Sequence, residues 1–458
     1  MVARKRLRID LPSCVNNMRR MFNEYSVNTT IYIYLLPTTT CTIYHLQEEV
    51  QSSDSLVSDS QMQVSPFNLH WALHPNVYIA PYTKPIVEIN GDIDKKEWND
   101  VPWSNPFDDI RGKEDAVPDE RPDHACQTRM KMMWDDEFLY IAAMIESDME
   151  VRATYEERNS PIYHQDSDFE VFVDTNSSCH DYKELEMNAI NTVWNLMLDK
   201  PYIDGGREHS GRIANPGDED FYEVYRQKTA ARLVEGSLND QSGDQRTVWT
   251  VEIALSHRDT LNRDRVHETD TSTSMMMPKE GDLWRINFSR VEKKGTLNWT
   301  WQKQSVWDPT LRKYCGKVDM HMPDAWGYIR FGPAKSTSAL IGQVPQEMIV
   351  DGNGVDIFWP LRIAGMNVYY AQRRFHDENG IYAKNVKDLI QFLDEGIMKP
   401  FMDEIILTTN SEQSSYNVFV IYEYSKGIET VLSLDNSRLM EIANRKKNTN
   451  DEVSTQKI

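Results

Sequence analysis

Acidic side chains recur at alternate positions in the stretch HQDSDFEVFVD, at Asp166, Asp168 and Glu170. On a β-strand such residues share one face and lie about 7 Å apart. Retaining glycosidases hold two carboxyl groups about 5–5.5 Å apart and inverting enzymes hold them farther apart, so this spacing alone does not exclude hydrolysis. Acidic residues at the start of a strand more often face solvent or bind a cation. We therefore assign no catalytic residue here.

A second set of acidic side chains lies in or beside predicted turns. Aspartates in turns supply carboxylate oxygens of the kind that calcium prefers. No EF-hand loop occurs in the sequence. A structural Ca²⁺ ion is therefore compatible with the chain, with its ligands unassigned among the turn acids Asp92, Asp94, Asp135, Asp136 and Asp174.

Other catalytic patterns are missing from the sequence, which contains no GxSxG motif, no Walker-type loop and no HExxH motif. The five cysteines are widely spaced and form no CxxC pair, which argues against zinc. His321 stands between Met320 and Met322, and a Met and a His can serve as axial ligands of haem. A lone histidine beside a proline turn is more often a hydrogen-bonded structural residue, and we prefer that interpretation.

Aromatic residues gather in the polar segment NWTWQKQSVWDP. Trp299 and Trp301 would share one face of a strand, whereas Trp307 precedes a turn and is either a lid on the core or an exposed platform. Sugars present apolar C–H faces on which aromatic rings stack, and ligand sites combine apolar walls with a few convergent polar groups. The candidate sugar-binding residues, two rings and two polar side chains, are Tyr163, Trp307, Glu170 and Asn188.

The 458-residue chain is strongly acidic, with 50 Lys and Arg against 71 Asp and Glu and a formal net charge of −21. Such a surface repels nucleic acids and anionic membranes, so we expect no nucleic-acid partner. The apolar segment 31–44 is broken by Pro37 and is too short to span a bilayer, and it makes a poor signal peptide. We expect no membrane span.

The periodicity of the sequence divides the chain into three parts. Residues 1–75 lack a periodic pattern and are expected to be a poorly ordered segment and linker. Residues 76–333 contain about nine short strand patterns with turn signals, which predicts an all-β fold, an antiparallel β-sandwich. Residues 334–458 predict a small α+β region with helices over 366–380 and 383–396 and a polar tail.

The motifs of the middle part resemble the family 9 carbohydrate-binding module. The matching stretches, in order, are IVEINGDIDKKEW, TRMKMMWDDEFLYIAAMIE, IYHQDSDFEVFVDTN, YKELEMNAINTVW, VWTVEIALS, GDLWRINFSRVE and HMPDAWGYIRF. The chain looks most like divergent family 9-like proteins that stand without a recognisable catalytic domain. The resemblance implies a jelly-roll type sandwich related to DOMON domains. It also implies bound calcium, an extracellular location and a site that grips the end of a sugar chain between two aromatic rings.

Carried over residue by residue, the resemblance places the first ring at Tyr163, with His164 as the alternative, and the polar contacts at Glu170 and Asn188. The second ring corresponds to Trp307, but the loop is longer than usual, so Trp301 and Trp326 are alternatives. The family has an arginine two residues before the asparagine, where this chain has Glu186.

The sequence thus predicts a noncatalytic protein that binds a polysaccharide or oligosaccharide and takes part in polysaccharide breakdown. A glycoside hydrolase or its accessory is an alternative, although 334–458 is too small for a (β/α)₈ barrel of about 250 residues. Kinship with DOMON folds leaves a haem or redox domain as another. A structural interaction protein with a degenerate sugar site is the last alternative, and Glu186 keeps it open.

Overall fold

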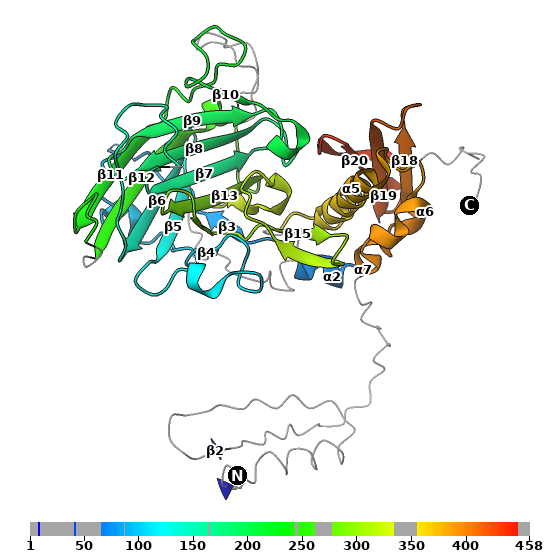
Figure 1. Ribbon diagram of the computed structural model, residues 1–458, viewed down its shortest axis with the longest axis horizontal. Helices are drawn as coiled ribbons and strands as arrows, with labels where there is room; N and C mark the ends of the chain where they lie inside the picture. Colours follow the sequence, from blue (N-terminus) through cyan, green and yellow to red (C-terminus); the bar gives the residue numbers. More distant parts are fainter. Residues whose placement is uncertain are drawn as a thin grey trace, which may run out of the picture. The chain divides into compact units, whose positions relative to one another are not determined.

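The computed structural model describes residues 8–9, 41–42, 66–86, 88–163, 165–242, 246–261, 277–333 and 355–447. The chain divides into two compact units, Met1–Gln63 and Val64–Ile458. In the first unit, β1 (Arg8–Ile9) pairs in antiparallel fashion with β2 (Cys41–Thr42). The second unit contains all the elements from α2 onwards that are labelled in Figure 1.

Most of the described strands before residue 333 form two sheets. The large sheet has the order β10-β9-β8-β7-β13-β14-β4, with β17 also paired to β13 and β3 paired to β17. The small sheet has the order β11-β12-β6-β5. Within the two sheets the described pairs are antiparallel except β17 with β3. The strands are β3 (Val77–Ala80), β4 (Asp108–Asp109), β5 (Thr128–Trp134), β6 (Phe138–Ser147), β7 (Asp168–Asp174), β8 (Tyr182–Asn188), β9 (Val193–Leu198), β10 (Glu208–Ser210), β11 (Lys228–Glu235), β12 (Thr247–Ser256), β13 (Leu283–Glu292), β14 (Leu297–Thr300) and β17 (Gly327–Phe331).

Alternating apolar residues build one core between the two sheets. Leu139 and Ile141 on β6 pack in the same buried cluster as Phe169 and Val171 on β7 and Trp249 on β12. On each of these strands, the other half of the side chains point to the opposite face of the sheet, because successive side chains on a strand alternate. The predicted all-β sandwich is confirmed by this arrangement.

The outer face of the large sheet carries polar side chains. The β7 residues that alternate with the core residues are Asp168, Glu170, Phe172 and Asp174. On β8, Glu186 lies directly opposite Glu170 in the strand pairing. These side chains are nevertheless buried, because other parts of the chain cover this face.

The C-terminal part has a core of its own, formed by helix α5 (Trp359–Asn379) packed on a sheet of strand order β18-β19-β20-β21 (Figure 1). Pro360 lies in the first turn of α5, where a missing N–H costs nothing. Gly380 ends the helix with φ 72°, as the sequence predicts. The remaining elements are β18 (Ile405–Thr409), β19 (Tyr416–Ser425), β20 (Ile428–Asp435), β21 (Met440–Lys446), α6 (Val386–Leu389), η5 (Ile390–Phe392), α7 (Glu395–Met398) and η6 (Met402–Glu404).

The helix predicted over 383–396 is broken into the short pieces α6, η5 and α7. Leu393 adopts an extended backbone with φ −87° and ψ 151°, which ends the first pieces. Asp394 then caps a new helix, since its side chain accepts hydrogen bonds from the backbone N–H groups of Gly396 and Ile397. A local capping signal therefore interrupts an apparently continuous helical pattern.

Two small elements outside these cores lie where both parts of the unit are in contact. The hairpin of β15 (Ser305–Asp308) and β16 (Lys313–Gly316) follows β14. Helix α2 (Asn68–Ala72) lies in the range 1–75, which the sequence assigned to a poorly ordered segment and linker. Its neighbour Phe67 instead joins the C-terminal core. The local sequence pattern could not predict the burial of Phe67, because the rings that cover it, those of Phe401 and Tyr422, are far away in the sequence.

The remaining short helices lie in the loops of the sandwich. They are η1 (Lys96–Trp98), η2 (Pro118–Glu120), η3 (Tyr202–Asp204), α3 (His257–Leu261) and η4 (Pro323–Ala325). Among all helices of the described residues, none is both long enough and apolar enough to pass through a membrane.

Candidate functional site

A cavity of about 510 Å³ opens where the hairpin β15–β16 and the loop after β4 face helix α5. Aromatic rings from three separate parts of the chain line it: Trp301 after β14, Trp307 and Tyr314 on the hairpin, and Trp359 and Tyr370 on α5. A cavity with aromatic walls and a few polar groups is the usual form of a small-molecule site.

Trp307 lines this cavity as part of β15 and is only 5% exposed. Its Nε1–H donates to the carbonyl oxygen of Phe392 at 2.8 Å, and its ring lies 5.6 Å from that of Tyr314. The turn that follows is set by Asp308, whose carboxylate accepts from the backbone N–H groups of Thr310 and Leu311. Of the two interpretations of Trp307, the structure shows the lid, and this ring is not an exposed platform.

Polar groups reach the cavity from α5 and the hairpin. The Asn367 amide oxygen accepts from the backbone N–H of Asp394 at 2.8 Å. Its amide nitrogen neighbours the Tyr314 hydroxyl, and neither group has another hydrogen-bond partner in the described part of the chain. Both atoms are buried, so neither presents a hydrogen-bonding group at the surface of the cavity.

Most of the charged side chains around the cavity form ion pairs. Arg111 pairs with Asp109 at 2.7 Å, and Lys303 pairs with Glu114 at 3.1 Å. Arg285 donates to the carbonyl oxygen of Trp326 at 2.7 Å. Burial lowers the pKa of His74 to about 4, so this imidazole is neutral at pH 7. The cavity thus suits an uncharged ligand with apolar faces and hydroxyl groups.

The other predicted binding residues do not line this cavity. Asn188 is fully engaged by its own loop: its Nδ2 donates to Tyr155 O and Asp166 Oδ2, both at 2.9 Å, and its Oδ1 accepts from the backbone N–H of Thr192. Tyr163 is half-buried, and its ring stacks at 6.1 Å on Trp194 of β9. The structure therefore separates Trp307 from the three residues with which the sequence grouped it.

The alternating acids 166, 168 and 170 also separate. Asp166 precedes β7, and its carboxylate accepts from the backbone N–H groups of Thr154 and Tyr155 at 2.9 Å. Asp168 and Glu170 lie on the strand and meet Glu186, with carboxylate oxygens that all lie within 4.8 Å of one another. Sequence reasoning treated Glu186 only as a departure from the family pattern, although the alternation of YKELEMN places it on the same face as Asn188.

Burial dominates the protonation of this carboxylate group. Burial raises the pKa of Glu170 to about 7. Burial first, and neighbouring carboxylates second, raise the pKa of Asp168, Glu184 and Glu186 well above the usual range. Like charges held together in a dry environment disfavour the ionised form.

The turn acids proposed for calcium are engaged with their own turns at three of the five positions. Asp92 accepts from the backbone N–H of Asp94 at 3.2 Å. Asp135 accepts from the backbone N–H groups of Glu137 and Phe138 and from the Tyr140 hydroxyl. Asp174 accepts from the backbone N–H of Cys179 at 2.8 Å. None of the five belongs to a group of three ligating side chains among the described residues.

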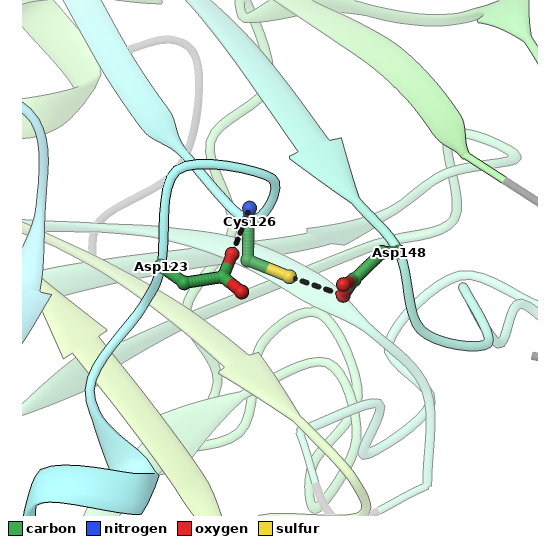
Figure 2. Close-up of side chains that lie close together, drawn as sticks. All are labelled: Asp123, Cys126 and Asp148. Atoms are coloured by element: carbon green, nitrogen blue, oxygen red, sulfur yellow. Dashed lines mark hydrogen bonds between the residues drawn. The ribbon is translucent and has the colours of Figure 1, made fainter.

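A second close group in the described chain consists of Asp123, Cys126 and Asp148 (Figure 2). The Cys126 thiol donates to Asp148 Oδ1 at 2.8 Å, and its backbone N–H donates to Asp123 Oδ1 at 3.1 Å. Burial raises the pKa of Cys126 to about 11, so the sulfur carries its proton at pH 7. The protein's own hydrogen bonds account for this group, which fastens the turn before β5.

The remaining candidates are structural. Trp326 is fully buried and donates from Nε1 to Met320 O at 2.8 Å, and Trp301 packs in the sandwich core as well as at the cavity edge. His321 Nδ1 shares a hydrogen bond with the Tyr182 hydroxyl at 3.0 Å, and burial lowers its pKa to about 4. His164 lies outside the described residues.

Comparison with known proteins supports the resemblance inferred from the motifs. Residues 89–204 match the model of the family described as "Carbohydrate family 9 binding domain-like". No curated protein sequence matches the chain.

Three solved structures are similar to parts of the chain. A candidate carbohydrate-binding protein from Bacteroides uniformis ATCC 8492 is 11% identical, with a TM-score of 0.38 over 56% of this chain and 99% of its own. A family 9 carbohydrate-binding module from Caldicellulosiruptor kristjanssonii in complex with cellotriose is 15% identical, with a TM-score of 0.32 over 59% of this chain and 100% of its own. Such a module from the same organism in complex with glucose is 16% identical, with a TM-score of 0.31 over 57% and 98%.

Proposed function

We propose that this protein, in which residues 89–204 form a carbohydrate family 9 binding domain-like region, binds carbohydrate without cleaving it. The observation that carries the proposal is the cavity of about 510 Å³, whose walls include tryptophan and tyrosine rings and most of whose charged side chains are paired. Rings stack on the C–H faces of a sugar, while the partly exposed side chains of Gln302 and Ser305, which line the cavity, offer hydrogen bonds to its hydroxyl groups.

We infer that the ligand is the end of an oligosaccharide or polysaccharide chain, and that the protein serves in polysaccharide breakdown as a binding component. Ion pairs of the carboxylates that line the cavity support a noncatalytic role: Asp109 pairs with Arg111, Glu114 with Lys303 and Asp115 with Lys313. A reducing-sugar assay on plant, fungal and algal glycans is expected to show no release.

Binding is measured on the full chain, first on a glycan array and then by calorimetry with the soluble sugars that score. Two variants test whether the sugar binds in the cavity, one by enlarging it and one by filling it. Trp307→Ala removes a stacking ring, and Ser305→Trp fills the space, because residue 305 lies two positions before Trp307 on β15 and shares its face. Each is expected to weaken binding at least about tenfold, as loss of a central aromatic contact does at binding sites.

The matched control is Trp103→Ala, which removes a half-buried tryptophan that packs beside the small sheet and does not line the cavity. Its affinity is expected to stay at the wild-type value. Circular dichroism of each variant establishes that it is folded. Wild-type affinity in folded Ser305→Trp and Trp307→Ala would show that the sugar does not bind in this cavity.

A further inference from the structure

The outer face of the large sheet buries carboxyl groups side by side. Asp168 and Glu170 on β7 and Glu184 and Glu186 on β8 are each no more than 5% exposed. Glu170 and Glu186 face each other in the strand pairing. The oxygens of Asp168, Glu170 and Glu186 lie within 4.8 Å of one another.

The neighbouring acids add negative charge to this group, although one of them, Glu292, pairs with Arg290 at 2.8 Å. The side-chain charges that act most strongly on Asp168 are those of Glu170, Glu292 and Glu184, and Glu184 is further opposed by Glu208. Buried charges without a partner are strongly destabilising, so such a group must either hold protons or bind a cation.

Unused hydrogen-bonding and ligating capacity also points into the group. Ser289 on β13 is fully buried and lies opposite Glu170 in the strand pairing. Apart from Glu170, its hydroxyl has no partner in the described part of the chain. Asp168 Oδ2 is likewise buried and makes no hydrogen bond to described residues. Buried polar atoms normally find partners, so these oxygens indicate a missing one.

We propose that Asp168, Glu170 and Glu186 bind a hard divalent cation of the calcium class, with the Ser289 hydroxyl as a further oxygen donor. All four donors are oxygens, which favours Ca²⁺ or Mg²⁺ over zinc. Calcium–oxygen distances of about 2.3–2.6 Å allow ligands on opposite sides of the ion to stand about 4.6–5.2 Å apart. The 4.8 Å limit on the separation of these oxygens is compatible with that sphere.

The proposal does not depend on sugar binding in the cavity, because none of these four residues lines it. The cation would instead stabilise the pairing of β7 with β8 and β13, where the carboxylates repel one another. Calcium is thus expected to act on stability, and the test reads stability and binding of the metal alone.

The full chain is dialysed against EDTA, and CaCl₂ is then titrated by calorimetry and by thermal unfolding. One equivalent of Ca²⁺ is expected to bind and to raise Tm by several degrees, because a ligand that binds only the folded state stabilises it. Terbium offers an independent probe, since its emission is sensitised by a nearby tryptophan, and Trp194 lies opposite Glu186 in the strand pairing.

The variant Glu186→Gln distinguishes a metal-binding role of Glu186 from a purely structural one. It removes one repelling charge without changing shape, so in EDTA the variant is expected to be at least as stable as the wild type. With Ca²⁺ it is expected to lose the bound equivalent and the rise in Tm. Asp168→Asn should behave in the same way.

Asp148→Asn is the matched control, because it alters the other acidic group of the described chain, around Cys126. It is expected to keep the full response to Ca²⁺. Absence of calcium binding in the wild type would overturn the proposal, as would an unchanged calcium response in Glu186→Gln and Asp168→Asn.

Discussion

At the scale of single residues, Arg438 is a buried cation that pairs with two acidic side chains. Its guanidinium is buried and forms ion pairs with Asp324 at 2.8 Å and with Asp204 at 3.1 Å. It also donates to the Tyr369 hydroxyl at 3.1 Å. Asp204 and Asp324 belong to loops of the sandwich, whereas Arg438 follows β20, so one side chain neutralises two buried acids from another part of the chain.

Replacing Arg438 by Met is expected to lower the free energy of unfolding by about 3–5 kcal/mol, because the buried Asp324 carboxylate loses its ion-pair partner. Asp204 keeps its ion pair with Arg373 at 2.8 Å. The control is Arg445→Met, since Arg445 is more than half exposed and pairs with Glu429 at 2.8 Å. Exposed pairs contribute at most about 1 kcal/mol. Urea denaturation measures both variants, and equal losses would contradict this account of Arg438.

At the scale of elements, helix α2 shows how five residues can be held by a distant core. His70 Nε2 hydrogen-bonds with the carbonyl oxygen of Ile397 at 2.9 Å, and Trp359 Nε1 donates to His70 O at 2.8 Å. The His70 ring also packs against those of Phe67 and Phe401. So short a helix would not persist alone, and tertiary packing stabilises it.

This burial makes the stability that His70 contributes depend on pH. Burial lowers its pKa from 6.5 to about 4, so the folded state favours the neutral ring more than the unfolded chain does. The contribution is therefore complete above pH 6.5 and is lost as the pH falls towards 4. Between pH 7.5 and 5.0 this group is expected to cost the fold about 2 kcal/mol.

His70→Gln keeps a side-chain donor and removes the titration. Urea denaturation at the two pH values gives the loss of unfolding free energy for each protein. The loss is expected to be smaller in the variant than in the wild type by that amount. Identical pH dependence in both would mean that His70 is not the buried neutral group described here.

At the scale of the whole molecule, the sandwich and the C-terminal part share buried contacts. Trp307 of the hairpin donates to Phe392, and Tyr314 packs against the C-terminal core. Phe67, before the first strand of the sandwich, also belongs to that core. At these contacts, the sandwich and the C-terminal part bury each other's side chains.

Residues 64–458 are therefore expected to unfold in one cooperative transition. Differential scanning calorimetry of the full chain should show a single endotherm whose van't Hoff enthalpy approaches the calorimetric enthalpy. Two resolved endotherms would show that the shared contacts are too weak to couple the two parts.

The sequence by itself determined the features that depend on near neighbours. Alternation along strands such as β6 and β7 predicted the sandwich, because a period of two specifies which side chains face the core. The left-handed residue Gly380 marked the end of α5, because its conformational preference is local. The motifs predicted the family resemblance over 76–333, of which residues 89–204 match the family model, and that too is a property of contiguous stretches.

Tertiary structure alone decided what the candidate site residues do. Trp307 became a buried wall because Phe392, 85 residues later, accepts its N–H. Glu170 met Glu186 because β7 pairs with β8 in one particular register. Polar residues at these spacings are equally compatible with solvent exposure, and only long-range pairing determines which of them lose water. The burial that creates a cavity or a cation site arises from those distant contacts, which no local pattern encodes.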